Sequence, residues 1–241
     1  DLPALLGRRR VLGLLAGAGL VALAGCDGPG AAGEAAPGEI AQETGGPFPA
    51  DGSNGPNVLA ESGVVRRDIR SSFGSLSGSA VGVPLTIELT ILDAATGAPR
   101  PGAAVYLWHC DAVGRYSLYD VEDQNWLRGV QVADDVGLLA FTTVFPGTYP
   151  GRWPHAHFEV YPDLATATGP DTAITVSQLA LPQEACAQVY AQPGYGESAT
   201  HLTEPIDDDM VFADGYDSQL ATTTGTVAGG YTARLTVPVA A

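Results

Sequence analysis

Short segments in which apolar and polar residues alternate, separated by turn residues, place the strongest constraint on the fold of this chain. The segment 85–91 alternates without a break, which predicts a strand with one buried face. Turn signals such as Thr96-Gly97 separate it from further predicted strands at 103–108, 128–133, 137–143, 155–161, 173–180 and 231–237. The 31 glycines and 18 prolines suit many turns. We therefore predict an all-β fold, a β-sandwich with long loops and one short helix near 182–190.

The predicted strand at 155–161 begins with two histidines, His155 and His157. Side chains two positions apart on a strand point to one face, so both imidazoles aim at a common point. Tyr116 and Tyr149 lie on the loops that approach this strand, and together the four side chains offer nitrogen and oxygen donors without sulfur. Such a set suits iron(III) better than zinc or copper(I). The plainer interpretation is a half-buried strand that carries two polar residues.

An ordered series of sequence blocks resembles the intradiol ring-cleaving dioxygenases, particularly their secreted branch. The blocks are 104–112 with 114–117, 127–131, 141–144, 145–149 with 151–152, and 155–157. A single block is weak evidence, but their order is specific, and the similarity extends over residues 44–237. The resemblance implies a non-haem iron(III) cofactor. It also implies cleavage of catechol-type rings by O2 between the two hydroxyl-bearing carbons, to give muconate-type products.

The resemblance also assigns roles to single residues. Tyr116 resembles the equatorial tyrosine ligand of the family and Tyr149 the axial one, while His155 and His157 resemble the histidine pair. We expect Tyr149 to leave the metal when substrate binds and to accept a substrate proton. Arg152 matches the arginine that stabilises negative charge on the bound ring.

Gln178 and the segment 44–48 extend the comparison to the substrate. Gln178 resembles a glutamine near the substrate in the family, although a surface position on a strand also explains it. The segment 44–48 resembles a Thr-Glu-Gly-Pro-Tyr entry segment, but Gly45 and Phe48 replace the acid and the tyrosine. The identity of the ring substituents is therefore not carried over.

Residues 1–26 are predicted to form an export signal with a lipobox. Arginines at 8–10 precede an apolar and glycine run at 11–23, and Leu23-Ala24-Gly25 leads to Cys26. We expect Cys26 to carry lipid and to anchor the exported protein on the outer face of the cytoplasmic membrane. Ordinary cleavage nearby would instead give a secreted protein.

Three further segments follow this signal. Residues 27–43 are rich in Gly, Ala, Pro and Glu and are predicted to be a flexible tether. Residues 44–80 form an N-terminal arm that lies on the domain, and residues 81–241 form the catalytic sandwich. If Cys26 carries lipid, an oxidising compartment favours a disulfide between Cys110 and Cys186, with two buried free thiols as the alternative.

The charge of the chain limits its partners. The formal net charge is −16, and all eleven basic residues are arginines, which argues against nucleic acid or an anionic membrane surface as a partner. The run Asp207-Asp208-Asp209 is interpreted as a solvated loop. A membrane is then approached only through the lipid, and the sequence sets no oligomeric state.

Two hypotheses on function follow. The first is an exported iron(III) dioxygenase that acts on a small aromatic diol and O2. The alternative is a non-catalytic β-sandwich module that binds plant polymer or aromatics on the cell surface. Tyrosinate bound to iron(III) absorbs visible light, so the colour of the iron-loaded protein separates the two hypotheses.

Overall fold

The computed structural model describes residues 38–241. The predicted export signal, with Cys26, and residues 27–37 of the predicted tether lie outside the described residues. The helices of the described part are α1 (Gln183–Tyr190) and α2 (Gly196–His201), with 3-10 turns at Pro170–Thr172 and Ile206–Asp208. The strands are β1 (Pro84–Asp93), β2 (Ala104–Trp108), β3 (Arg128–Val132), β4 (Leu138–Val144), β5 (His155–Tyr161), β6 (Thr175–Ala180), β7 (Thr222–Thr226) and β8 (Gly230–Val239).

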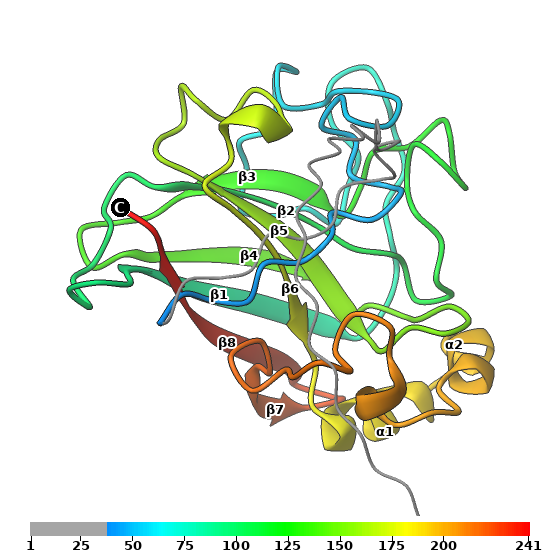
Figure 1. Ribbon diagram of the computed structural model, residues 1–241. Coiled ribbons are helices and arrows are strands. Elements are labelled where there is room, and N and C mark those ends of the chain that lie inside the picture. Colours follow the sequence, from blue (N-terminus) through cyan, green and yellow to red (C-terminus); the bar gives the residue numbers. More distant parts are fainter. Residues whose placement is uncertain (1–37) are drawn as a thin grey trace, which may run out of the picture. The chain divides into compact units, whose positions relative to one another are not determined.

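The strands form two four-stranded sheets that pack face to face (Figure 1). One sheet has the order β4-β1-β8-β7, and the other has the order β3-β2-β5-β6. Neighbouring strands are antiparallel except β1 and β8, which run parallel. The predicted all-β sandwich with little helix is confirmed.

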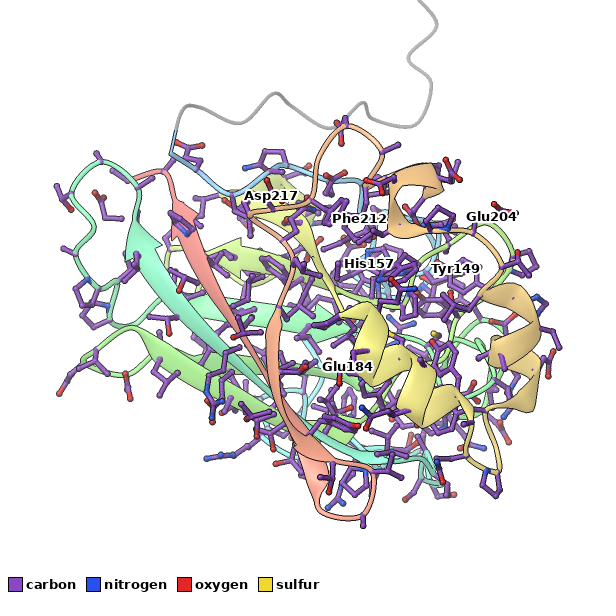
Figure 2. The ribbon with its side chains drawn as sticks, turned by 90° about the horizontal axis from the view of Figure 1, so that it is seen from below. Tyr149, His157, Glu184, Glu204, Phe212 and Asp217 are labelled. Atoms are coloured by element: carbon purple, nitrogen blue, oxygen red, sulfur yellow. The ribbon has the colours of Figure 1, made fainter. Side chains whose placement is uncertain are left out.

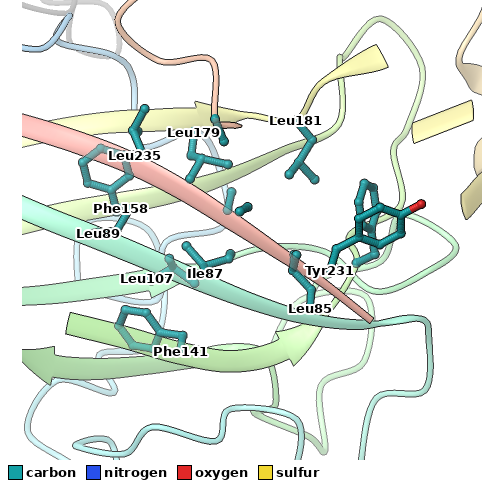
Figure 3. Close-up of a cluster of buried hydrophobic side chains, with 14 of the residues drawn as sticks. Leu85, Ile87, Leu89, Leu107, Phe141, Phe158, Leu179, Leu181, Tyr231 and Leu235 are labelled. Atoms are coloured by element: carbon teal, nitrogen blue, oxygen red, sulfur yellow. The ribbon is translucent and has the colours of Figure 1, made fainter. Parts of the chain in front are cut away.

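The hydrophobic core lies between the two sheets (Figure 3). The alternation read from segment 85–91 is visible in β1, whose inward residues are at most 2% exposed: Leu85, Ile87, Leu89 and Ile91. Leu107 of β2 and Phe158 of β5 reach the same core from the opposite sheet. Each such side chain contributes about 1.5–3 kcal/mol when it leaves water.

The sheet β3-β2-β5-β6 is buried on both faces. Every residue of β2 and of β5 is buried, on whichever face it lies. One face meets the core, and the other, here called the outer face, carries Tyr106 and Trp108 of β2 with His155 and His157 of β5. The register places Trp108 beside His157 on one side and Gln178 of β6 beside it on the other.

Residues 38–80 cover the domain. Tyr106 Oη donates a hydrogen bond to the Pro49 carbonyl at 2.7 Å, and farther along Val65 bridges to Val130 of β3. The structure corrects the predicted tether at 38–43. Ile40 is fully buried in the core, and its amide donates to the Pro238 carbonyl at 2.9 Å. The buried Ile40 side chain and backbone hydrogen bonds such as that from the Glu43 amide to the Val176 carbonyl dock this stretch against the sandwich.

The predicted disulfide between Cys110 and Cys186 is not formed, because both thiols are free and buried. They belong to different groups of packed side chains. Cys186 of α1 lies in the core between the sheets, whereas Cys110 packs with Trp108 on the outer face. The Sγ of Cys110 donates to the Gly147 carbonyl at 3.4 Å, and that of Cys186 to the Leu181 carbonyl at 3.7 Å.

The predicted helix near 182–190 is confirmed as α1, whereas α2 and β7 were not predicted. β7 is a Thr-rich edge strand without apolar alternation, so its sequence lacks the signal of a half-buried strand. Among residues 38–241, no helix is long and apolar enough to cross a membrane.

Candidate metal centre

Two imidazoles of β5 face each other on the outer face of the sheet. The Nε2 atoms of His155 and His157 lie 3.1 Å apart. Nδ1 of His155 lies 2.5 Å from the Trp153 carbonyl, which only accepts, so this nitrogen carries the proton and Nε2 keeps a free lone pair. Both rings are buried, at 1% and 2% exposure. The strand thus presents nitrogen donors to one point, as the two-residue spacing predicted.

The ring of His157 lies between the indole of Trp108 and the backbone of Gly46. The indole of Trp108 stacks on it, with centroids 5.0 Å apart and planes 3° apart. On the arm, Gly46 has a φ of +69°, and a Cβ there would lie 3.2 Å from Cε1 of His157. Nδ1 of His157 has no hydrogen-bond partner within residues 38–241. The stacked indole and the hydrogen bond between the two Nε2 atoms therefore orient this imidazole.

Two tyrosines from different loops complete the cluster. The hydroxyl oxygens of Tyr116 and Tyr149 lie 3.4 Å apart, and that of Tyr149 lies 3.4 Å from Nε2 of His155. The backbone amide of Tyr116 donates a hydrogen bond to the Asp120 carboxylate at 2.8 Å, which closes the loop. The ring of Tyr116 packs on that of Phe48, with centroids 4.8 Å apart. Tyr116 is 1% exposed, whereas Tyr149 is only partly buried. The more accessible phenol is therefore Tyr149.

Burial keeps all four groups neutral in the absence of a cation. Desolvation lowers the pKa of His155 and His157 well below the ordinary value, with the charge of Arg152 as the next cause. Desolvation also raises the pKa of Tyr116 well above its ordinary value, and the neighbouring Tyr149 raises it further. The pKa of Tyr149 is raised by burial, while Arg152 opposes that shift.

The donor set fits the iron(III) that the resemblance implies. Among residues 38–241, no three His, Cys, Asp or Glu side chains gather around a possible metal position, so zinc-like or calcium-like sets are absent there. The four converging side chains instead offer two imidazole nitrogens and two phenol oxygens. Hard anionic oxygen with imidazole nitrogen suits a hard trivalent ion.

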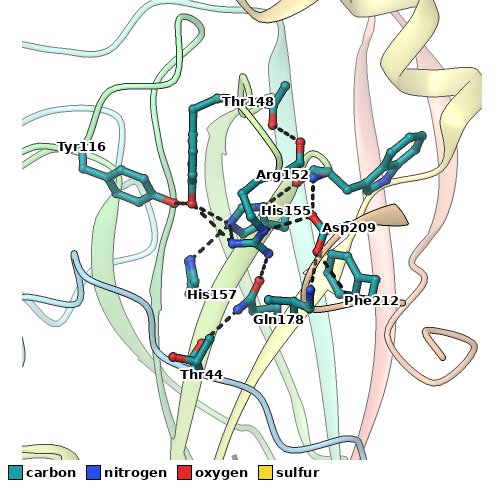
Figure 4. Close-up of polar contacts among 12 residues, drawn as sticks. Thr44, Tyr116, Thr148, Arg152, His155, His157, Gln178, Asp209 and Phe212 are labelled. Atoms are coloured by element: carbon teal, nitrogen blue, oxygen red, sulfur yellow. Dashed lines mark hydrogen bonds and ion pairs between the residues drawn. The ribbon is translucent and has the colours of Figure 1, made fainter. Parts of the chain in front are cut away.

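Arg152 connects this cluster to its surroundings (Figure 4). Its Nη1 lies 3.4 Å from the Tyr149 hydroxyl and 3.4 Å from Nε2 of His155. Its Nη2 donates to Oε1 of Gln178 at 2.6 Å, and its Nε donates to the Asp209 carboxylate at 3.0 Å. Every edge of the guanidinium thus has a partner, and one nitrogen points to the centre.

The structure decides between the two interpretations of Gln178 and corrects the interpretation of Asp209. Gln178 is fully buried, which excludes the surface interpretation, and its Nε2 donates to the Thr44 carbonyl at 2.9 Å. Asp209 is 4% exposed and forms an ion pair with Arg152, so the interpretation of 207–209 as wholly solvated was wrong. Asp207 and Asp208 are indeed exposed. No local pattern distinguishes the third aspartate from the first two.

Part of the chain is similar in sequence to known dioxygenases. Residues 55–167 match the family described as Dioxygenase, and this range contains the four donors and Arg152. Hydroxyquinol 1,2-dioxygenase of Nocardioides simplex is 30% identical over 122 residues, which are 43% of this chain and 40% of that protein. Catechol 1,2-dioxygenase of Pseudomonas sp. (strain EST1001) is 39% identical over 54 residues, 22% of this chain and 18% of that protein. The chain therefore spans less than half the length of these curated relatives.

The fold has a counterpart among solved structures. The intradiol ring-cleavage dioxygenase from Tetranychus urticae superposes with a TM-score of 0.64 at 21% identity, covering 84% of this chain and 93% of that one. With the match at 55–167, this confirms that the chain resembles the intradiol ring-cleavage dioxygenases. Residues 55–167 match the Dioxygenase family, and the sandwich has the fold of the Tetranychus urticae structure.

Proposed function

We propose that this protein is a non-haem iron(III) dioxygenase that cleaves catechol-type rings between the two hydroxyl-bearing carbons. The observation that carries the proposal is the convergence of Tyr116, Tyr149, His155 and His157 on one point beside Arg152. The match to the Dioxygenase family and to hydroxyquinol and catechol 1,2-dioxygenases supports the reaction class. The substrates are a small aromatic diol and O2.

These four side chains would hold the iron. Bound there, iron(III) supplies the positive charge that makes a catechol dianion accessible at neutral pH and the redox partner for attack by O2. Free phenols have a pKa near 10 and keep their protons at neutral pH, so the enzyme needs a base as well. Tyr149 is suited to this role, because it is the more accessible tyrosine and its oxygen contacts Arg152.

Arg152 has the geometry to stabilise negative charge in the reaction. Its Nη1 lies within 3.4 Å of the Tyr149 oxygen, so it faces the place where a deprotonated ring oxygen would develop. The side chain of Arg152 is 8% exposed, and a charge interaction is stronger in such a water-poor site. Gln178 fixes the far edge of the guanidinium through Nη2.

Oxygen uptake tests this proposal. Iron-loaded protein should consume one O2 per ring with catechol and with hydroxyquinol, and the product should absorb in the ultraviolet as a muconate. The resting protein should be coloured by tyrosinate bound to iron(III). A colourless protein after iron loading, with no oxygen uptake on any catechol, would contradict the enzyme and favour a binding module.

We also propose that the protein is exported and anchored by lipid on Cys26. The sequence of residues 1–26 supports this proposal, since arginines, a short apolar run and Leu-Ala-Gly-Cys follow one another. Replacing Cys26 by Ser and fractionating the cells tests it. The wild type should sediment with membranes and Cys26→Ser should not; equal sedimentation of both contradicts the anchor.

A further inference from the structure

Asp209 brings a distant segment of the chain to the metal centre. Its carboxylate accepts four hydrogen bonds. Oδ2 receives Nε of Arg152 at 3.0 Å and the amide of Trp153 at 2.5 Å, while Oδ1 receives the amides of Val211 and Phe212 at 2.8 and 3.2 Å. The carboxylate therefore joins residues 152–153 to residues 209–212.

Apolar packing holds this junction rigid. Trp153, Val211 and Phe212 form one buried group with Ala180, and Trp153 Nε1 donates to the Leu181 carbonyl at 2.7 Å. Asp209 and Arg152 are almost without solvent contact, at 2% and 8% side-chain exposure. The attraction between the two charges is weakly screened in such surroundings.

The ion pair decides which part of Arg152 reaches the centre. Asp209 binds Nε and Gln178 binds Nη2, so only Nη1 is directed at Tyr149 and His155. The carboxylate also balances the charge of the guanidinium. A ring substituent that carried its own carboxylate would have to compete with Asp209 for this cation.

The segment around Asp209 adds more negative charge on this side. Residues 203–219 contain six Asp and Glu and no basic residue. Figure 2 shows Phe212 between Glu204 and Asp217, on the side of the sandwich that carries Tyr149 and His157. Glu43 lies close enough to Arg152, Asp209 and Asp214 to feel all three charges; its pKa is raised to about 7, chiefly by burial, with a further rise from Asp214.

The other buried guanidinium near the centre is engaged elsewhere. Arg128 is 1% exposed, and its donors go to the carbonyls of Phe48, Pro49 and Ser117 and to the hydroxyl groups of Ser117 and Tyr106. It is held under the arm, and each of its three nitrogens donates to a protein group.

We propose that Asp209 is a positioning residue that aims Nη1 of Arg152 at the metal centre and, by neutralising its charge, makes the site select catechols with uncharged ring substituents. This inference rests on the proposed function. Within that function, the substrates are catechols with uncharged substituents, and Asp209, which lies outside the matched range 55–167, determines this preference.

Two ligands of one shape test the selection. 3,4-Dihydroxybenzamide and 3,4-dihydroxybenzoate differ in the charge of one substituent. Their affinities for the iron-loaded wild type are measured without oxygen from the change in visible absorption. We expect the amide to bind at least tenfold more tightly than the carboxylate. Equal affinity, or preference for the carboxylate, overturns the inference, whereas failure of every catechol to bind overturns the proposed function itself.

Asp209→Asn tests the residue, with Asp208→Asn as the control. Asp208 is exposed and precedes Asp209 directly, so the control removes the same charge without touching Arg152. In Asp209→Asn the preference for the amide should fall at least fivefold, and kcat on catechol should fall more than tenfold while iron content is retained. Asp208→Asn should keep both values. An unchanged preference in folded, iron-loaded Asp209→Asn overturns the role of this residue.

If Asp209→Asn does not fold, Gln178→Glu gives a second measurement. This variant places a second carboxylate on Nη2 of Arg152, where Gln178 now binds. The preference for the amide over the carboxylate should then rise above the wild-type value. No change in that ratio contradicts the control of selectivity by the charge on Arg152.

Discussion

Gly46 of the arm lies against the ring of His157 with no room for a side chain: a Cβ atom at Gly46 would lie 3.2 Å from Cε1 of that imidazole. Such a contact would be tighter than most real Cβ contacts, and His157 is already stacked on Trp108. The arm therefore sets the position of one proposed iron ligand directly, through the absence of a side chain.

Gly46→Ala should weaken iron binding by about 10–100-fold, as expected when the surroundings of a metal ligand are disturbed. Gly97→Ala is the matched control, because its φ of +71° is nearly that of Gly46 at +69° and nothing lies within 4 Å of its Cβ position. Both variants carry the backbone strain of about 1–2 kcal/mol. Iron titration should separate them; equal affinities would show that the arm does not hold His157.

Tyr149→Phe and Tyr116→Phe should have different effects. Tyr149 is the accessible phenol beside Arg152, so its loss should lower kcat by about 10²–10⁴-fold while three protein ligands still hold iron. Tyr116 is buried against Phe48, and its loss should change the resting colour and the iron affinity. Iron content is measured beside turnover at saturating catechol. Wild-type turnover by iron-loaded Tyr149→Phe would refute its role as base.

Glu159→Gln should change how stability depends on pH. Burial raises the pKa of Glu159 from 4.5 to about 8, opposed by the hydrogen bond from Tyr161. Between these values the folded protein holds a proton that the unfolded chain has released, so rising pH favours unfolding. The free energy of unfolding of the wild type should lose up to about 1.4 kcal/mol per pH unit through this group.

Denaturant titrations of the variant and the wild type at pH 5 and pH 8 measure this effect. Glu159→Gln should gain stability relative to the wild type as the pH rises, whereas Glu204→Gln, on an exposed residue, should not. A constant difference between Glu159→Gln and the wild type at both pH values would show that Glu159 is ionised in the fold.

The thiols of Cys110 and Cys186 should behave as two separate buried groups. Burial raises the pKa of both thiols, which suppresses the reactive thiolate. Neither should react with a thiol reagent in the folded protein, and both should react after unfolding without a reductant. If the thiols react after unfolding only when a reductant is added, Cys110 and Cys186 form the disulfide that the sequence predicted.

The sequence predicted the two sheets and the histidine pair better than the contacts that surround the site. Alternation in β1 and the spacing of His155 and His157 are local signals, and each predicts a side-chain direction from two-residue periodicity alone. Asp209 gave no such signal, because its role depends on an ion pair with Arg152, 57 residues earlier in the chain. A run of three aspartates does not show which one is buried.

Two of the missed features left no hydrophobic pattern in the sequence. β7 is paired by backbone hydrogen bonds with β8, and its exposed threonines carry no burial pattern. Ile40 is a lone apolar residue in a segment of low hydrophobicity, yet it fills a place in the core. β7 is fixed by backbone pairing with its chain neighbour β8, and Ile40 by core partners far away in the chain, and neither relation leaves an apolar pattern in the sequence.

In the sheet β3-β2-β5-β6, the metal centre and the hydrophobic core lie on opposite faces, so the centre can be redesigned without changing the core. Trp108, His157 and Gln178 form one cross-strand row on the outer face, while their neighbours along the strands face the core: Leu107, Ala156, Phe158 and Leu179. A designer can therefore vary donors along this row, for instance by a carboxylate or a third imidazole at 108 or 178, and leave the packed interior of the sandwich as it is.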